Sequence, residues 1–265
     1  MAKRIILLLT LLCVSPSAFA QFWWHRTLST KADTSDANFI RPSDWNASLK
    51  PFPDSSTFIS DDFWSGLTAL GNIGELAWTI SVAGTGVLGV ITGVANHPAI
   101  DTFSTGTTSA SALILHLSST TVGVILPTNF FDITYIVKLS QSDANTSVKA
   151  GMANSATSAT PTNGIYFEKL DADNNWFGVC RASAAQTRTA AMNATGTGWV
   201  KMRVRLRDYT TDSVCFSING GTESCLGANK PTTNLIPFVR IANSTAAAKN
   251  MYIDYFSLRV WPITR

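Results

Sequence analysis

Glutamate is scarce in this chain, and the few glutamates do not form the pair that sugar cleavage needs. The 265 residues contain only Glu75, Glu168 and Glu223. Retaining glycosidases hold two carboxyl groups about 5 Å apart around the scissile bond. Glu168 and Asp171 are three residues apart, and because strand side chains alternate between faces, this odd spacing puts the two acids on opposite faces. The sequence therefore predicts a protein that is not a glycoside hydrolase.

Motifs of several other chemistries are also missing. The sequence has no Cys-x-x-Cys pair or His/Cys cluster for zinc, no Gly-x-Ser-x-Gly elbow and no phosphate-binding loop. A lyase would need a base, but we interpret His116 as a hydrogen-bonded strand residue and His97 as a loop residue. We expect no cofactor. A weak calcium candidate, Asp171 and Asp173, has an ordinary hairpin turn as its alternative interpretation.

Charge and hydrophobic runs exclude two further classes of partner. The chain has 20 basic and 17 acidic residues, and without its first 20 residues the balance is 18 to 17, so nothing favours nucleic acid. The apolar run over residues 5–14 is too short for a stable membrane span. It follows Lys3-Arg4 and precedes Ala18-Phe19-Ala20, as in a secretory signal peptide. Residues 1–20 are therefore a signal peptide or, alternatively, an uncleaved hydrophobic segment that packs into an assembly.

The next segment, residues 21–60, has neither strand nor helix periodicity and is predicted to be an extended arm. It carries prolines and several aromatic residues. These aromatics either anchor the arm on the rest of the chain or on a partner protein, or they are simply an apolar terminus. We interpret them as candidate assembly contacts: Phe22, Trp23, Trp24 and Trp45.

Strand periodicity dominates the rest of the chain. Along residues 199–207 the even positions are Val, Met, Val and Leu, while the odd positions from Lys201 onward are basic, which separates an apolar face from a charged one. A second alternating run ends at Asn219-Gly220-Gly221, residues typical of a hairpin turn. About a dozen such strands without a helix predict an all-β, two-sheet antiparallel jelly-roll sandwich over residues 61–265. The main expected strands span 76–82, 87–94, 112–117, 132–139, 164–170, 176–182, 199–207, 214–218, 235–241 and 251–260.

The same hairpin predicts a disulfide. With a three-residue loop at Asn219, residues whose numbers sum to 440 face each other, so Cys215 lies opposite Cys225 at a separation close to that of a disulfide. We favour this bridge in an oxidising compartment, with Cys180 left over. The alternative is three reduced thiols, as in a bacterial cytoplasm.

Two groups of residues are candidates for ligand contact. Lys201, Arg203 and Arg205 lie about 6.6 Å apart along one strand face, a spacing that could meet repeated anionic groups of a glycan or a neighbouring subunit. The plainer interpretation is a solvated outer face. Tyr166 and Trp176, in the two strands flanking the Asp171 hairpin, are candidate glycan-binding aromatics.

Seven segments of the chain carry motifs of a known fold: 96–100, 105–108, 164–168, 175–177, 199–206, 214–220 and 251–258. These motifs resemble those of the concanavalin A-like lectin/glucanase sandwich, and more narrowly those of structural proteins of tailed bacteriophages and prophages that carry such a domain. The resemblance implies a non-catalytic binding or assembly protein of a virion surface or tail, which engages neighbouring subunits of a homo-oligomer or a glycan. A secreted bacterial lectin-like module is the alternative, and a polysaccharide hydrolase or lyase comes third. The expected location is thus a virion or the extracellular space.

Overall fold

All regular elements in the described part of the chain are β-strands. The structure, a computed structural model, describes residues 57–63, 72–94, 97–117, 130–141, 144–171, 173–194, 196–206 and 213–261. No helix among them is long and apolar enough to cross a membrane. The strands are β1 (Thr57–Asp61), β2 (Asn72–Ile73), β3 (Trp78–Ala83), β4 (Val87–Val94), β5 (His97–Ser104), β6 (Ala112–His116), β7 (Phe130–Leu139), β8 (Thr146–Ala153), β9 (Gly164–Lys169), β10 (Asn175–Ala182), β11 (Ala185–Arg188), β12 (Asn193–Ala194), β13 (Trp199–Leu206), β14 (Val214–Ile218), β15 (Ser224–Leu226), β16 (Ile236–Asn243) and β17 (Asn250–Trp261).

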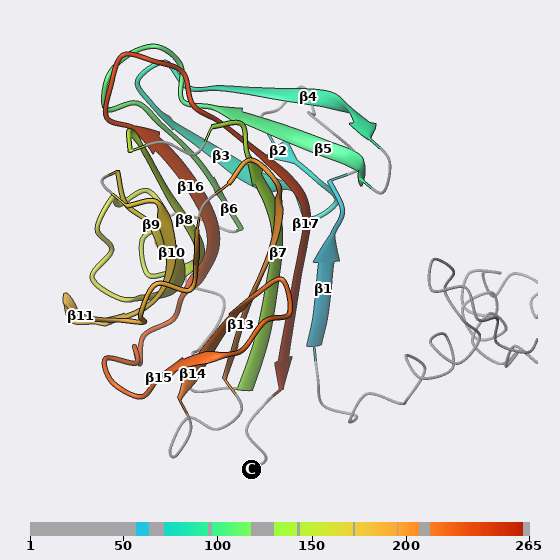
Figure 1. Cartoon of the computed structure of the whole chain (residues 1–265). Helices are drawn as coiled ribbons and strands as arrows, with labels where there is room; N and C mark the ends of the chain where they lie inside the picture. Colours follow the sequence, from blue (N-terminus) through green and yellow to red (C-terminus); the bar gives the residue numbers. More distant parts are fainter. Residues whose placement is uncertain are drawn as a thin grey trace, which may run out of the picture. The chain divides into compact units, whose positions relative to one another are not determined.

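The strands form two antiparallel sheets that pack face to face (Figure 1). Sheet A has the order β15-β14-β13-β7-β17-β5-β4, and β1 also pairs with β17. Sheet B has the order β11-β10-β9-β8-β16-β6-β3-β2, with β12 beside β10. The long strand β17 holds two partners on one edge, since its first residues pair with β5 and its last with β1. The predicted all-β sandwich of two antiparallel sheets is confirmed.

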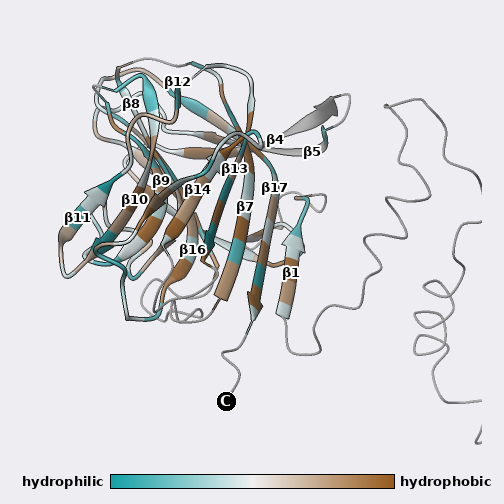
Figure 2. Ribbon diagram, turned by 60° about the horizontal axis from the view of Figure 1, so that its bottom comes forward, coloured by the Kyte–Doolittle hydropathy of each residue, from teal (hydrophilic) through white to brown (hydrophobic). Residues whose placement is uncertain are grey.

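Alternation along β13 builds the inner face of sheet A as predicted. Val200, Met202, Val204 and Leu206 are buried in the core, while Lys201 between them is exposed. Figure 2 shows the same change between apolar and polar residues along the neighbouring strands. The inner face of sheet B supplies the other half of the core, including Trp78 and Trp176. Burial of these two apolar faces against each other is the main force that holds the sheets together.

A buried carboxylate links the two sheets at their edge. Asp61, at the end of β1, accepts hydrogen bonds from the Phe63 and Leu76 backbone N–H groups and from the Trp78 indole, at 2.8, 2.9 and 3.0 Å. Gly74 passes so close that a Cβ there would lie 2.3 Å from an Asp61 oxygen, and its φ is +69°. Asp61 thereby ties β1 of sheet A to β3 of sheet B.

Several strands differ from the sequence expectations; the short β2, β11 and β12 were not predicted, and three other differences affect larger parts of the fold. β8, in the middle of sheet B, was not predicted, because Thr146–Ala153 is rich in small residues and lacks a strong apolar alternation. His97 was expected in a loop but begins β5. Residues 57–60 were assigned to the arm, yet they form most of β1, which pairs with β17. The candidate assembly residues Phe22, Trp23, Trp24 and Trp45 lie outside the described residues.

The hairpin of β14 and β15 has the register expected from its turn. Asn219 and Gly220 both have positive φ, at 52° and 73°. Cys215 faces Cys225, and their sulfur atoms form a disulfide. Cys180 remains a buried free thiol in the core.

Candidate functional site

A groove of about 740 Å³ lies on the outer face of sheet B, away from the core. Val148 and Ala150 of β8 point into the core, so Lys149 between them points outward into this groove. The polar residues that line it come from β8, β9, β10, β11 and β16 and from nearby loops: Ser147, Lys149, Thr160, Glu168, Asp171, Arg181, Gln186, Arg240, Asn243 and Ser244. We call it the sheet-B groove.

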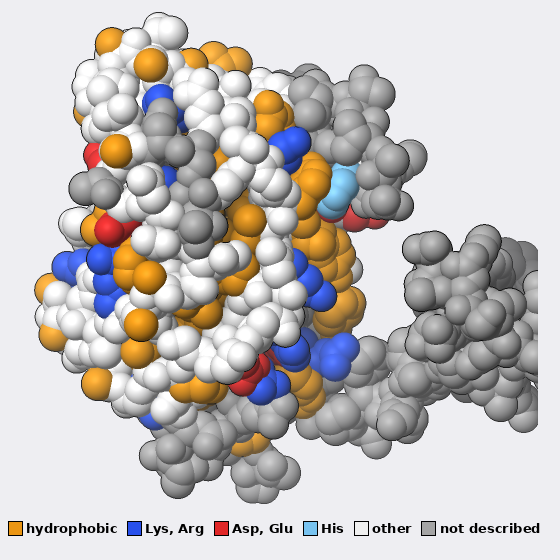
Figure 3. Space-filling model, viewed as in Figure 1, with side chains coloured by type: hydrophobic (Ala, Val, Ile, Leu, Met, Phe, Trp, Pro, Cys, Tyr) orange, Lys and Arg blue, Asp and Glu red, His pale blue; other side chains and the backbone are white. Residues whose placement is uncertain are grey.

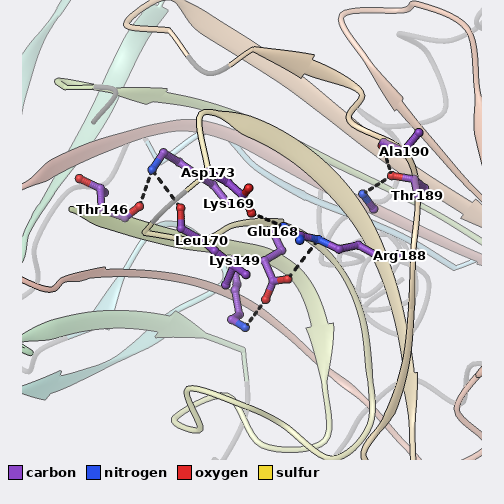
Figure 4. A network of polar contacts seen from close by, with 10 residues as sticks. Thr146, Lys149, Glu168, Lys169, Leu170, Asp173, Arg188, Thr189 and Ala190 are labelled. Carbon is purple, nitrogen blue, oxygen red and sulfur yellow. Dashed lines mark hydrogen bonds and ion pairs between the residues drawn. The ribbon is translucent and has the colours of Figure 1, made fainter. Parts of the chain in front are cut away.

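A row of charged side chains crosses the floor of the sheet-B groove. In the strand register, Lys149 lies between Glu168 on β9 and Arg240 on β16. The Lys149 ammonium donates a hydrogen bond of 2.6 Å to Glu168 Oε1, and both side chains are buried (Figure 4). On the other side, Arg188 Nε lies 3.7 Å from Glu168 Oε2. The Glu168 carboxylate therefore lies between two cations, and its hydrogen bond is made to Lys149.

The sheet-B groove carries more positive charge than its own carboxylates neutralise. Among the described residues that line it, three are cationic and two are acidic. Burial lowers the pKa of Lys149, the partner Glu168 opposes this, and the charges of Arg240 and Arg181 lower it further. Burial also lowers the pKa of Arg240, against an opposing effect of Asp171. Negative charge in the groove would relieve this repulsion, so the site favours an anionic ligand.

The aromatic candidates Tyr166 and Trp176 are not exposed stacking surfaces. Trp176 is 1% exposed because even-numbered residues of β10 face the core, so its assignment as a glycan contact is wrong. Tyr166 is fully buried beneath the groove, where its ring packs edge-on against Phe238 and lies 5.1 Å below the Lys149 ammonium. Burial, assisted by Glu168, raises the pKa of Tyr166 to about 12. Tyr166 supports the groove floor and does not contact a ligand with its ring face.

The hairpin between β9 and β10 bears the weak calcium candidates. Asp173 accepts a hydrogen bond of 2.7 Å from Arg188, and its backbone N–H donates to the Leu170 carbonyl within the turn. Among the described residues, neither Asp171 nor Asp173 belongs to a cluster of three side chains with metal-ligand spacing. Asp173 thus serves to hold Arg188 against Glu168 (Figure 4).

The predicted basic residues lie on the opposite side of the molecule, on the outer face of sheet A. Arg203 binds Asp132 with two hydrogen bonds from Nε, at 2.9 and 3.0 Å, and a further one from Nη2. This pairing raises the pKa of Arg203. Arg205 donates to Glu223, and Lys201 is exposed. Lys201, Arg203 and Arg205 therefore share one face, as predicted, but two of the three are engaged by carboxylates that the sequence did not reveal.

Both described histidines have structural partners. His116 is buried, and its Nε2 lies 3.1 Å from Ser81 Oγ, which fits the predicted strand role. His97 Nδ1 lies 2.8 Å from Asp254 Oδ2, and its ring stacks on Trp199 with centroids 4.1 Å apart. Asp254 sits at the point where the register of β17 shifts. Neither histidine lines the sheet-B groove.

Sequence reasoning missed most of the sheet-B groove. Lys149 lies on the unpredicted β8, and Arg181 and Arg240 each stand singly in a strand with no local motif. Only Glu168 drew attention, as one of three glutamates. One signal could have indicated these four charged residues: each is a charged side chain at an outward position of an otherwise apolar strand.

No protein-family model matches this sequence, and neither does any curated protein. Solved structures do match. They include a protein of unknown function from Shewanella oneidensis MR-1 (15% identity, TM-score 0.60, covering 87% of this chain and 100% of that one). The carbohydrate recognition domain of Emp47p matches at 7% identity and a TM-score of 0.52, over 80% of this chain and 99% of that one. The binding domain of botulinum neurotoxin DC, solved with rat synaptotagmin II, matches at 12% identity and a TM-score of 0.50, over 77% of this chain and 48% of that one. These likenesses establish a lectin-like jelly-roll fold.

Proposed function

We propose that this chain is a non-catalytic lectin-like protein that binds an anionic glycan in the sheet-B groove. The observation that carries the proposal is the buried pair of Lys149 and Glu168 on the groove floor, with Arg240 beside Lys149 and Arg188 beside Glu168. Burying charges is costly unless they are paired. Lys149 and Glu168 are paired and held in place, and the cations beside them are available to attract a charged ligand into the open groove. The carbohydrate recognition domain among the structural neighbours supports a sugar as the ligand.

The absence of catalysis is part of the same proposal. Glu168 is engaged by cations on both oxygens, and Asp171, the other acid of the groove, follows at odd spacing beyond the end of β9. This arrangement differs from the two facing carboxyl groups of a glycosidase. Alginate incubated with the protein should therefore gain neither reducing ends nor unsaturated sugar ends. Either product would show that the chain is a hydrolase or a lyase.

The binding proposal can be tested with alginate, an acidic polysaccharide, and dextran, a neutral one. In affinity electrophoresis the protein should be retarded by alginate and not by dextran. Arg240→Gln should weaken retardation about tenfold, the loss expected for one charge-assisted contact. Lys138→Gln, a matched loss of one cation on sheet A, should have no effect. Equal retardation of the wild type and the Arg240 variant would contradict the proposal.

For the biological setting, we propose a surface or tail-associated component of a phage-type virion, assembled from several copies. The resemblance of the strand motifs to phage structural proteins supports it, whereas the Cys215–Cys225 disulfide favours the alternative of a secreted lectin. Electron microscopy of the natural source, with sequencing of the N-terminus, separates the two. An intact Met1 in a particle supports the virion, and a mature Gln21 in the culture supernatant supports secretion.

A further inference from the structure

The outer face of sheet A contains a second hollow that is separate from the sheet-B groove. Two adjoining cavities of about 390 and 240 Å³ share Asp132, Arg203 and Arg259. The larger one falls in the range of small-molecule sites. We call the pair the arginine cavity; its lining includes Asp132, Lys201, Arg203, Arg205, Arg259 and Trp261. Figure 3 shows lysine and arginine side chains beside hydrophobic ones along this flank of β17.

A single carboxylate sits at the centre of the arginine cavity. In the register Asp132 of β7 faces Arg259 of β17 on one side and Arg205 of β13 on the other. Among the described residues that line the two cavities, Lys201 and three arginines are cationic and Asp132 is acidic. A second described acid, Glu223, pairs with Arg205. The described lining of the arginine cavity is therefore predominantly cationic.

Aromatic rings frame the same cations. The Arg259 guanidinium carbon lies 5.3 Å from the Phe58 ring centroid and 5.5 Å from that of Trp261. Phe58 is 46% exposed, which is unusual for so large an apolar side chain in a strand. Rings beside arginines and one acid provide both an apolar surface and polar groups of both signs.

We propose that the arginine cavity binds one carboxylated sugar residue, such as a uronic acid. The arginines would bind the sugar carboxylate, Asp132 would accept hydrogen bonds from sugar hydroxyls, and Trp261 would pack on the apolar ring face. A bare phosphate fits less well, because it has neither sugar hydroxyls to donate to Asp132 nor an apolar ring face for Trp261 to pack on. This site shares a ligand class with the sheet-B groove but no residue, so each proposal can fail without the other.

The test uses the full chain labelled with nitrogen-15 and three probes followed by NMR: glucuronate, glucose and acetate. Glucuronate should shift the indole signal of Trp261 in a saturable way, assigned by its loss in Trp261→Phe. Arg259→Gln should weaken this binding about tenfold, the loss expected for one charge-assisted contact. Glucose and acetate, which carry only the ring or only the charge, should bind at least tenfold more weakly. Lys138→Gln, about 20 Å along β7 from Asp132, is the matched control and should bind as the wild type does.

Three results would overturn the proposal. Saturation by acetate as readily as by glucuronate would reduce the arginine cavity to a simple anion site. Unchanged binding in Arg259→Gln, with the fold intact by circular dichroism, would remove the arginines from recognition. A Trp261 signal that glucuronate does not move would leave no site there, while retention of the wild type by alginate, lost in Arg240→Gln, would still show that the sheet-B groove binds.

Discussion

At the scale of single residues, Cys180 gives the fold a definite pH dependence. Burial raises the pKa of this core thiol to about 12, from an ordinary value near 9. Between these values the unfolded chain loses the proton and the folded chain keeps it, so stability is complete below pH 9 and falls as the pH rises. The raised pKa of Tyr166 acts in the same direction above pH 10.

We therefore expect the free energy of unfolding to fall above pH 9 by up to about 1.4 kcal/mol per pH unit for Cys180 alone. Urea unfolding at pH 8, 9 and 10 measures this slope. Cys180→Ala should be less stable at pH 8, because a buried sulfur is removed, but should lose less with rising pH. Parallel pH profiles for the two proteins would refute the assignment.

The buried pair of Lys149 and Glu168 makes a second prediction at this scale. Lys149→Met should cost about 3–5 kcal/mol, because Glu168 keeps its charge in a buried place with only the more distant Arg188. The double variant Lys149→Met and Glu168→Leu should regain most of that loss, since two apolar side chains need no pairing. Chemical unfolding of the wild type, both single variants and the double variant gives the coupling energy. Additive losses would mean that the two groups do not interact.

At the scale of elements, the β14–β15 hairpin depends on both its turn and its disulfide. The Cys215–Cys225 bridge closes a loop with a sequence separation of 10. Loop-closure entropy for such a ring is worth about 3 kcal/mol. Replacing both cysteines by alanine should lower the free energy of unfolding by about that amount, measured with denaturant under non-reducing conditions. Reduction of the wild-type disulfide should cause the same loss. A loss of unfolding free energy below about 0.5 kcal/mol would contradict the prediction, because it would mean that the unfolded chain gains little conformational freedom when the bridge is removed.

Elements with strong periodicity could be read from the sequence, and those without it could not. Val200 to Leu206 alternate cleanly, so both the strand and its buried face were predictable. β8 was not, because Ala150, Gly151 and Ala153 carry almost no side-chain signal although the strand is central in sheet B. Without β8 the sheet-B groove could not be predicted. Lys149 is brought beside Glu168 and Arg240 only by the pairing of β8 with strands that are distant in the sequence.

At the scale of the whole molecule, we expect that the sandwich does not need the first 54 residues. Every described strand lies between Thr57 and Trp261. We therefore propose that a chain starting at Ser55 keeps the thermal stability of the full chain within about 2 °C, a difference that corresponds to well under 1 kcal/mol for this size. Differential scanning calorimetry of the two chains makes the comparison.

A chain starting at Trp64 should behave quite differently, although it is only nine residues shorter. It lacks β1 and Asp61, so the outer edge of β17 loses its partner over Phe256–Val260 and the Trp78 indole loses its acceptor. An unsatisfied buried donor alone costs about 1–3 kcal/mol, and the unpaired edge invites aggregation. Melting well below that of the Ser55 chain would place the domain boundary before β1 and not at residue 61. Equal melting of the two shortened chains would instead show that β1 belongs with the arm and adds nothing to the sandwich.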